Sequence, residues 1–507
     1  MRLLTRWAAV VAAVALSAAV PAIAHAAAPQ PPLHQVLVVG NNWDGTADVI
    51  DPRTFKKLIR LNIVPDKDQR IAEINADPAA KGFFTGINLL IGEGHNQYVD
   101  DAFTSHDGRF LFVSRPSFKD VVGIDLRTRR IAWRVQVDGY RSDHMAISPS
   151  GRRLLVSAST ANVVDEIDAE KGKIVRKFPS GDSPHESNYI HGGRQIVHAS
   201  IGRVYTPTDD PETGKGERYF QVVDNRTFKI LSRVDMGKKL EEAGHPGMSS
   251  AVRPMAVAPG DRYVYLQVSF FHGFVEYDLQ KQKVLRLAHL PLSEKAKKMR
   301  RDEYLLDSAH HGIAINPAGR RICVAGTMSD YAAMVERSTF TYKIVAHGER
   351  PYWVTNSGDG RYCFISFSGN DAVAALSYAK RREVARIPVG DHPQRMRIGQ
   401  IRCGYLGPKV DCTRPRMSRL RVMKTSDGRR LRARLSEHAS LRIAISRLTG
   451  GRWAHLRTVE REAKKGMNLL ALGQLASASR YRLLVTGTDS AGNESPTRVA
   501  RFRIRFR

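Results

Sequence analysis

A four-strand pattern recurs through roughly the first 400 residues of the chain. Its clearest copy is 142–178, where four short runs rich in β-branched residues are separated by turns containing Pro, Gly, Asn and Asp. One such unit has two open edges and too little apolar surface to fold by itself. The unit must therefore recur and pack against further copies of itself.

The turn residue Gly151 marks the position of each repeat. Equivalent turns fall at Gly108, Gly193, Asp261, Gly319 and Gly360, at intervals of 43, 42, 68, 58 and 41 residues. A period near 42 residues with four strands per unit predicts a β-propeller. The two longer intervals are expected to contain insertions.

Unpaired strands at the two ends of the repeat region predict how the ring closes. Three strands, 36–39, 48–50 and 57–63, have no inner strand before them, and 390–398 supplies an inner strand with no blade after it. Joining them removes the exposed sheet edges. The expected fold is all-β, with a seven-bladed β-propeller over residues 34–400 followed by a small β-sandwich.

Two segments resemble the YVTN β-propeller repeat family. Tyr352-Trp-Val-Thr-Asn356 is close to the motif that names the family, and 163–175 is similar to its recurring blade pattern. The resemblance implies the propeller fold over about residues 34–400. It is compatible with several functions, because the family is similar both to binding propellers and to the propellers of redox enzymes such as nitrous-oxide reductase and quinoprotein dehydrogenases.

Residues 416–507 change to seven alternating apolar and polar runs, which predict a β-sandwich. The segment 481–493 resembles the late hairpin of bacterial Ig-like and fibronectin-III-like modules. Residues 413–507 contain 23 Lys and Arg but 6 Asp and Glu, a net charge of +17. This charge either binds an anionic cell-envelope polymer or is the solvated face of an arginine-rich sheet.

The N-terminus has the pattern of a secretory signal peptide. Arg2 and Arg6 precede the apolar run 7–20, and small residues offer a cleavage site near residue 26. We therefore expect residues 1–26 to be removed and the protein to be secreted or extracytoplasmic, with cell-surface association through the basic module. No transmembrane segment is expected in the mature chain.

Four cysteines are too few for a disulfide scaffold. Cys403 and Cys412 bracket a short loop in the linker 401–415, and their spacing predicts a disulfide. Cys323 and Cys363 occupy matching strands of adjacent blades, where we expect two buried, unpaired side chains.

Three insertions interrupt the repeat. Residues 66–94 are expected to form a long connection, 202–219 a polar excursion and 291–307 a helix capped by Ser293.

A polar column identifies the mouth of the central channel, where propellers commonly bind small molecules or protein partners. We call the residues eight positions before each turn, with the equivalent in the closing strand, the rim column: Asp100, Asp143, His185, Arg253, His311, Tyr352 and Gln394. Glu186 lies beside this column.

Histidines are concentrated near the rim column: His95, His144, His185, His310, His311 and His392. Several imidazoles directed at one point are the usual ligands of zinc, copper or iron. No HxH or HExxH pair fixes a ligand spacing. A transition-metal site and a merely polar funnel are therefore both compatible with the sequence.

These observations give three candidate functions. The first is an exported binding protein with a polar, His-rich mouth, localised by the basic module. The second is an extracytoplasmic oxidoreductase that uses copper, iron or zinc at the same mouth. The third is a lactonase-like hydrolase in which carboxylates hold a divalent ion. No GxSxG, P-loop or Rossmann glycine pattern points to another chemistry.

Overall fold

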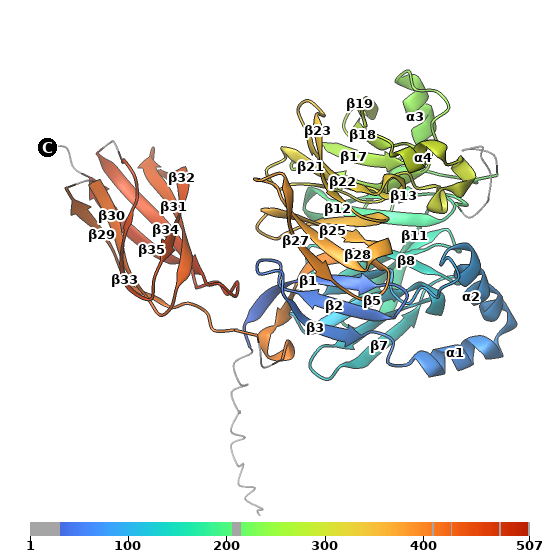
Figure 1. Cartoon of the computed structure of the whole chain (residues 1–507), viewed down its shortest axis with the longest axis horizontal. Coiled ribbons are helices and arrows are strands. Elements are labelled where there is room, and N and C mark those ends of the chain that lie inside the picture. Colours follow the sequence, from blue (N-terminus) through green and yellow to red (C-terminus); the bar gives the residue numbers. More distant parts are fainter. Residues whose placement is uncertain (1–30, 205–213, 408–409, 427, 476–477, 505–507) are drawn as a thin grey trace, which may run out of the picture. The chain divides into compact units, whose positions relative to one another are not determined.

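The computed structural model describes residues 31–204, 214–407, 410–426, 428–475 and 478–504. Within these ranges, residues 33–402 form seven four-stranded antiparallel sheets (Figure 1). The predicted β-propeller is confirmed. The proposed signal peptide, 1–26, lies outside the described residues.

The strands of the seven sheets, in sheet order from the channel outward, have the following bounds: β28 (Pro393–Arg402), β1 (Leu33–Asn41), β2 (Thr46–Ile50), β3 (Lys57–Asn62); β4 (Asp101–Thr104), β5 (Phe110–Arg115), β6 (Asp120–Asp125), β7 (Arg130–Gln136); β8 (Ser142–Ile147), β9 (Arg153–Ala158), β10 (Val163–Asp168), β11 (Lys173–Pro179); β12 (Pro184–Ile190), β13 (Gln195–Ser200), β14 (Phe220–Asp224), β15 (Ile230–Val234); β16 (Val252–Val257), β17 (Tyr263–Val268), β18 (Gly273–Asp278), β19 (Lys283–His289); β20 (Ile313–Ile315), β21 (Arg321–Gly326), β22 (Tyr331–Glu336), β23 (Tyr342–His347); β24 (Pro351–Asn356), β25 (Tyr362–Phe367), β26 (Ala372–Ser377), β27 (Arg382–Pro388).

The inner strands close into a ring. Strand β28 contacts β4, and the contacts continue through β8, β12, β16, β20 and β24 back to β28. The closing sheet joins the two ends of the repeat region, with Leu37 of β1 opposite Ile398 of β28. Pairing these ends completes the seventh sheet, so the end strands of the repeat region pair with each other instead of remaining open edges.

Apolar side chains pack between adjacent sheets. Phe112 and Val121 of one sheet share a cluster with Leu154 and Val156 of the next, and similar clusters occur around the ring. Burial of each such side chain contributes roughly 1.5–3 kcal/mol. The inter-sheet layers therefore hold the sheets rigidly and leave the channel side for polar residues.

Residues 417–504 form the two sheets of the expected β-sandwich. Their orders are β29-β30-β33 and β32-β31-β34-β35, and Leu431, Ile443 and Leu483 lie in the core between them. The bounds are β29 (Met417–Thr425), β30 (Gly428–Leu435), β31 (Ala439–Thr449), β32 (Arg452–Ala463), β33 (Gly466–Ala471), β34 (Ser479–Thr488) and β35 (Arg498–Ile504). Likeness to an Ig-like module stays a prediction.

The first insertion, the long connection expected at 66–94, is helical, which the sequence interpretation did not foresee. Helices α1 (Lys67–Ala76) and α2 (Pro78–Leu90) occupy it. The Asp77 side chain accepts hydrogen bonds from the backbone of Ala79 and Ala80, and Pro78 occupies the first turn of α2. Cap and proline together define a helix start that the sequence interpretation overlooked.

The other insertions follow the sequence more closely. Ser293 caps α4 (Glu294–Lys298), as expected, although this helix ends early and is followed by 3₁₀ turns. In the insertion 202–219, residues 205–213 lie outside the described residues. The remaining helices are α3 (Met236–Glu242), η1 (Pro116–Phe118), η2 (His191–Gly193), η3 (Arg301–Glu303), η4 (Leu305–Asp307), η5 (Thr327–Ser329), η6 (Ser368–Asn370) and η7 (Cys403–Tyr405). No helix in the described ranges has the length and apolar character needed to cross a bilayer.

Both cysteine pairs form disulfides. Cys403 is bonded to Cys412, the pairing suggested by their spacing. Cys323 of β21 is bonded to Cys363 of β25, so the expectation of two unpaired side chains was wrong. Matching strands of adjacent sheets bring their Cα atoms to 6.7 Å, within the range that a disulfide spans.

Candidate metal centre

Irregularities in the inner strands position the rim column. The register shifts between Ser142 and Met145 in β8, and equivalent shifts occur in β12, β16 and β24. A bulge places two residues opposite one and redirects their side chains. Consecutive residues such as Asp143 and His144 can therefore both face the channel.

Side chains of the second strands fix these bulges. Ser114 of β5 donates a hydrogen bond to the carbonyl oxygen of Asp143 (2.7 Å), and Ser157 of β9 donates to that of His185 (2.7 Å). Gln267 forms two hydrogen bonds with the backbone of Gly312, next to His311. Each bond joins adjacent sheets, so the backbone beneath the channel is anchored.

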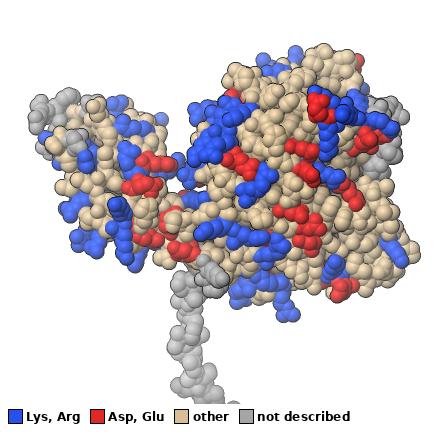
Figure 2. All heavy atoms as spheres, viewed as in Figure 1, with Lys and Arg blue, Asp and Glu red and all other residues tan. Residues whose placement is uncertain are grey.

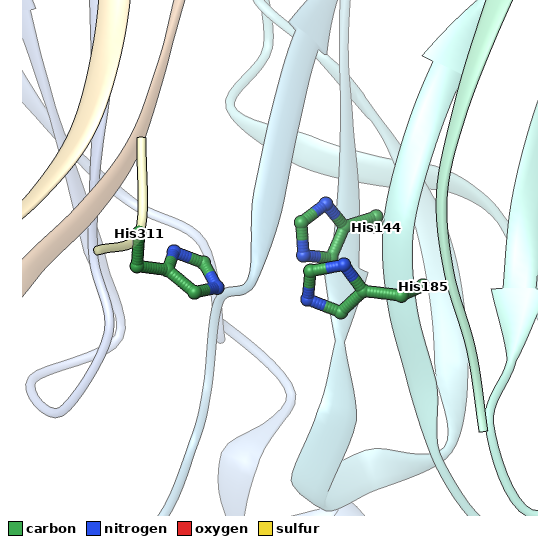
Figure 3. A group of neighbouring side chains, drawn as sticks. All are labelled: His144, His185 and His311. Atoms are coloured by element: carbon green, nitrogen blue, oxygen red, sulfur yellow. The ribbon is translucent and has the colours of Figure 1, made fainter. Parts of the chain in front are cut away.

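Three histidines from different sheets meet in the channel (Figure 3). His144 lies on β8, His185 on β12, and His311 just before β20. Each offers a ring nitrogen, and these three nitrogens lie within 4.8 Å of one another. Figure 3 shows the rings of His144 and His185 side by side, with a nitrogen of His311 directed toward them.

These three imidazoles are buried and neutral. Their exposed fractions are 2%, 3% and 1% for His144, His185 and His311. Burial lowers the pKa of each well below its usual value. The charge of Arg395 lowers the pKa of His144 further, and that of Arg253 lowers the pKa of His185 and His311. Neutral imidazole is the form that binds a metal ion.

Two of the three rings have a ring nitrogen without a hydrogen-bond partner. The Nδ1 atoms of His185 and His311 are buried and have no partner among the described residues. His144 differs, because the guanidinium of Arg395 contacts its ring nitrogens. The face of the His311 ring lies against Tyr352, with ring centroids 4.1 Å apart.

A second candidate ligand group contains Asp100, Asp143 and His144. Here the carboxylates already have partners: Asp100 accepts from Arg395, and Asp143 accepts from Arg141 and from Ser159 (3.0 Å). These carboxylates neutralise buried guanidinium groups. The three-histidine group is therefore the better ligand set.

A small cavity adjoins the histidines, with a volume of about 50 Å³. Asp100, Asp143, His185, Arg253, His311, Tyr352 and Gln394 line it, so the whole rim column meets there. Arg141 and Arg395 also line it. Three of the apolar lining residues, Ile91, Val204 and Leu306, each come from a different insertion.

The other candidate histidines lie elsewhere. His95 and His392 both stack on the indole of Trp43, and the ring centroid of each lies 3.8 Å from that of the indole. His310 is buried beside Tyr331 and His272. None of these three belongs to a potential metal-binding group in the described part of the chain.

Two other predicted rim residues have structural contacts. Glu186 accepts hydrogen bonds from the backbone of Met255 (2.9 Å) and from Asn188 (3.0 Å), which links adjacent inner strands. Gln394 accepts a bond from Asn42 (3.1 Å), although it also lines the cavity.

Sequence reasoning missed Arg141, Arg395 and Trp353. Trp353 lies near His144, with ring centroids 5.6 Å apart. Arg395 and Trp353 follow rim-column residues directly, just as His144 follows Asp143. The residue that directly follows each rim-column residue was therefore the sequence signal that could have identified Arg395 and Trp353.

No protein-family model matches the chain, and no curated protein matches it. Among solved structures, the chain is similar to a chain of Kuenenia stuttgartiensis Hydrazine Synthase, with 15% sequence identity and a TM-score of 0.46. The similarity covers 61% of this chain and 96% of that chain.

Proposed function

We propose that His144, His185 and His311 bind one divalent transition-metal ion and that the propeller is a metal-dependent oxidoreductase. The observation that carries this proposal is the convergence of three buried, neutral imidazoles whose ligand nitrogens lie within 4.8 Å of one another. Three imidazoles suit copper, iron or zinc. The predicted signal peptide supports export of this enzyme.

Convergence of the ring nitrogens favours a metal over a merely polar funnel. Three neutral, buried imidazoles offer lone pairs within 4.8 Å of one another, which is the arrangement that a metal ion can bridge. Metal–nitrogen bonds of about 2.0–2.1 Å require the three ring nitrogens to move closer to one another than the 4.8 Å within which they lie. Arg395 must turn away from His144 on binding, and its contact with Asp100 can persist.

Three protein ligands leave a coordination position open, which is typical of catalytic rather than structural sites. His185 and His311 line the cavity, so the open position would face it. The rings of Tyr352 and Trp353 lie against the ligand histidines. Because both side chains are oxidisable, this arrangement favours electron transfer over hydrolysis when the bound ion is copper or iron, since zinc has no redox chemistry.

Elemental analysis tests the metal. The full chain, purified without a chelator or a His tag, is expected to contain about one copper, iron or zinc ion per molecule. Protein that stays metal-free after incubation with each of these ions would contradict the enzyme proposal and favour the exported binding protein. Calcium in their place would favour the hydrolase.

A second candidate function is attachment to an anionic cell-envelope polymer through the sandwich. Arginines face one another across its strands: Arg421 opposite Arg432, Arg480 opposite Arg503, and Arg482 opposite Arg501. Like charges directly opposite are destabilising, so an external polyanion would relieve the repulsion. Figure 2 shows Lys and Arg side chains over the visible face of this part of the chain.

Retention of the full chain on immobilised polyphosphate tests this attachment. We expect retention that falls steeply with salt, because exposed charges are screened beyond roughly 8–10 Å at physiological ionic strength. The double change Arg421→Gln and Arg432→Gln should elute earlier than Arg130→Gln, an exposed control on the propeller strand β7. Equal elution of the two variants would indicate that the opposed arginines are only a solvated face.

A further inference from the structure

Arg253 is the one lining residue of the cavity that has a charge without an ionic partner among the described residues. Its exposed fraction is 1%. The Nη2 atom donates to the hydroxyl of Ser308, but Nε and Nη1 have no hydrogen-bond partner. A buried guanidinium normally has both an anion and hydrogen-bond acceptors.

The neighbouring charges show that this arrangement is unusual. Arg141 pairs with Asp143, Arg395 pairs with Asp100, and Lys215 pairs with Asp307 at 2.8 Å. Within the described ranges, no ion pair includes Arg253. The cavity lining therefore has three guanidinium groups against two carboxylates, and it lacks one negative charge.

The cavity also limits the size of a ligand. Its volume of about 50 Å³ is closed partly by Ile91, Val204 and Leu306, which belong to three separate insertions. A water-sized group occupies roughly 10–15 Å³ of such space, so about three to five non-hydrogen atoms fit. Larger anions such as sugar phosphates are excluded.

We propose that this cavity binds a small monovalent oxyanion, of the size of formate or acetate, whose charge is neutralised by Arg253. The proposal rests on the metal centre proposed above, because the same cavity is lined by His185 and His311. The ligand would then be held between the bound ion and the guanidinium. This proposal makes the substrate a small carboxylate or a similar planar oxyanion.

Titration with anions of increasing size tests the proposal. The full chain is first loaded with cobalt(II), and its visible absorption is followed during addition of formate, acetate or butyrate. Formate and acetate are expected to shift the spectrum and bind. Butyrate, with six non-hydrogen atoms, should bind at least about tenfold more weakly, the loss expected when a charge-assisted hydrogen bond cannot form.

A matched pair of variants locates the binding group. Arg253→Met should weaken formate binding by at least about tenfold, whereas Arg130→Gln, which removes an exposed arginine of β7, should leave it unchanged. Arg253→Met should also unfold at a higher temperature than the parent chain without anion, because it removes a buried charge that has no ion-pair partner among the described residues. Unchanged formate binding in this variant, or a large loss of its stability, would overturn the proposal.

The thermal measurement separates the two proposals. If cobalt(II) does not bind, the metal centre is wrong, and unfolding of the metal-free chain with formate still tests the anion site. A rise in unfolding temperature that disappears in Arg253→Met supports the oxyanion. Cobalt(II) binding without any effect of formate or acetate leaves the metal centre intact and refutes the oxyanion.

Discussion

Two groups of histidines occupy similar positions in the repeat but contact their neighbours in different ways. His144, His185 and His311 present ring nitrogens to one another in the channel. His95 and His392 instead lie with their ring faces on Trp43, at interplanar angles of 8° and 7°. The first group shares a point in space, whereas an indole separates the rings of the second.

This difference distinguishes chemistry from packing. A metal ion needs ring nitrogens about 2.0–2.1 Å from one point, which the intervening indole prevents for His95 and His392. Their stacking is an aromatic contact worth roughly 0.5–1.5 kcal/mol per pair beyond the buried area. Sequence distance from a repeat marker therefore does not identify a ligand. The direction of the ring nitrogens does.

The largest expected effect is a loss of bound metal, which should occur on substitution of the channel histidines but not of the histidines stacked on Trp43. His185→Ala or His311→Ala should lower metal affinity by more than the roughly 10- to 100-fold that the loss of a residue supporting a ligand costs. His392→Ala should keep the full metal content. Measurement is by elemental analysis after equilibration with a buffered metal solution. Equal loss of metal in His392→Ala would show that the two groups act together.

The loss of folding stability at acid pH provides a second test of the difference between the two histidine groups, because His392 is buried and neutral. Burial lowers the pKa of His392 to about 3, with the charge of Arg350 as a further cause. Its ordinary value is about 6.5, so between these values the unfolded chain binds a proton that the folded chain does not. The contribution of neutral His392 to the free energy of unfolding is fully present above about pH 6.5 and is lost as the pH falls toward about 3.

The size of this effect is the change in unfolding free energy per pH unit. His392→Gln should reduce the dependence of unfolding free energy on pH by about 1.4 kcal/mol per pH unit between roughly pH 4 and 6. Urea unfolding at several pH values measures it, with His106→Gln, which removes an exposed imidazole, as the control. An unchanged slope in His392→Gln would mean that this ring is already charged in the folded state.

The repeat predicted the propeller because turn spacing and strand alternation are local properties of the sequence. The channel could be predicted only in part. The rim column was found from position eight before each turn, but His144 and Arg395 are at the next position. Bulges in strands such as β8 and β12 bring both positions to the channel, and nothing in the residue pattern indicates a bulge.

Pairing across sheets was also difficult to predict. Cys323 and Cys363 were expected to be unpaired because the sequence does not give the distance between adjacent sheets. Likewise, Trp43 separates His95 from His392 although no motif connects these three residues. Such contacts depend on tertiary geometry, whereas the helix start at Asp77 and Pro78 was local and could have been recognised.

The smallest expected effect belongs to His95. This residue is exposed, unlike His392, and contacts Trp43 through one ring face. His95→Ala should lower the free energy of unfolding by no more than about 1.5 kcal/mol, the upper value for an aromatic pair. Its metal content should equal that of the parent chain, because the indole lies between His95 and any shared site. Urea unfolding together with elemental analysis checks both expectations, and a loss of metal in His95→Ala would place this ring in the channel instead of on Trp43.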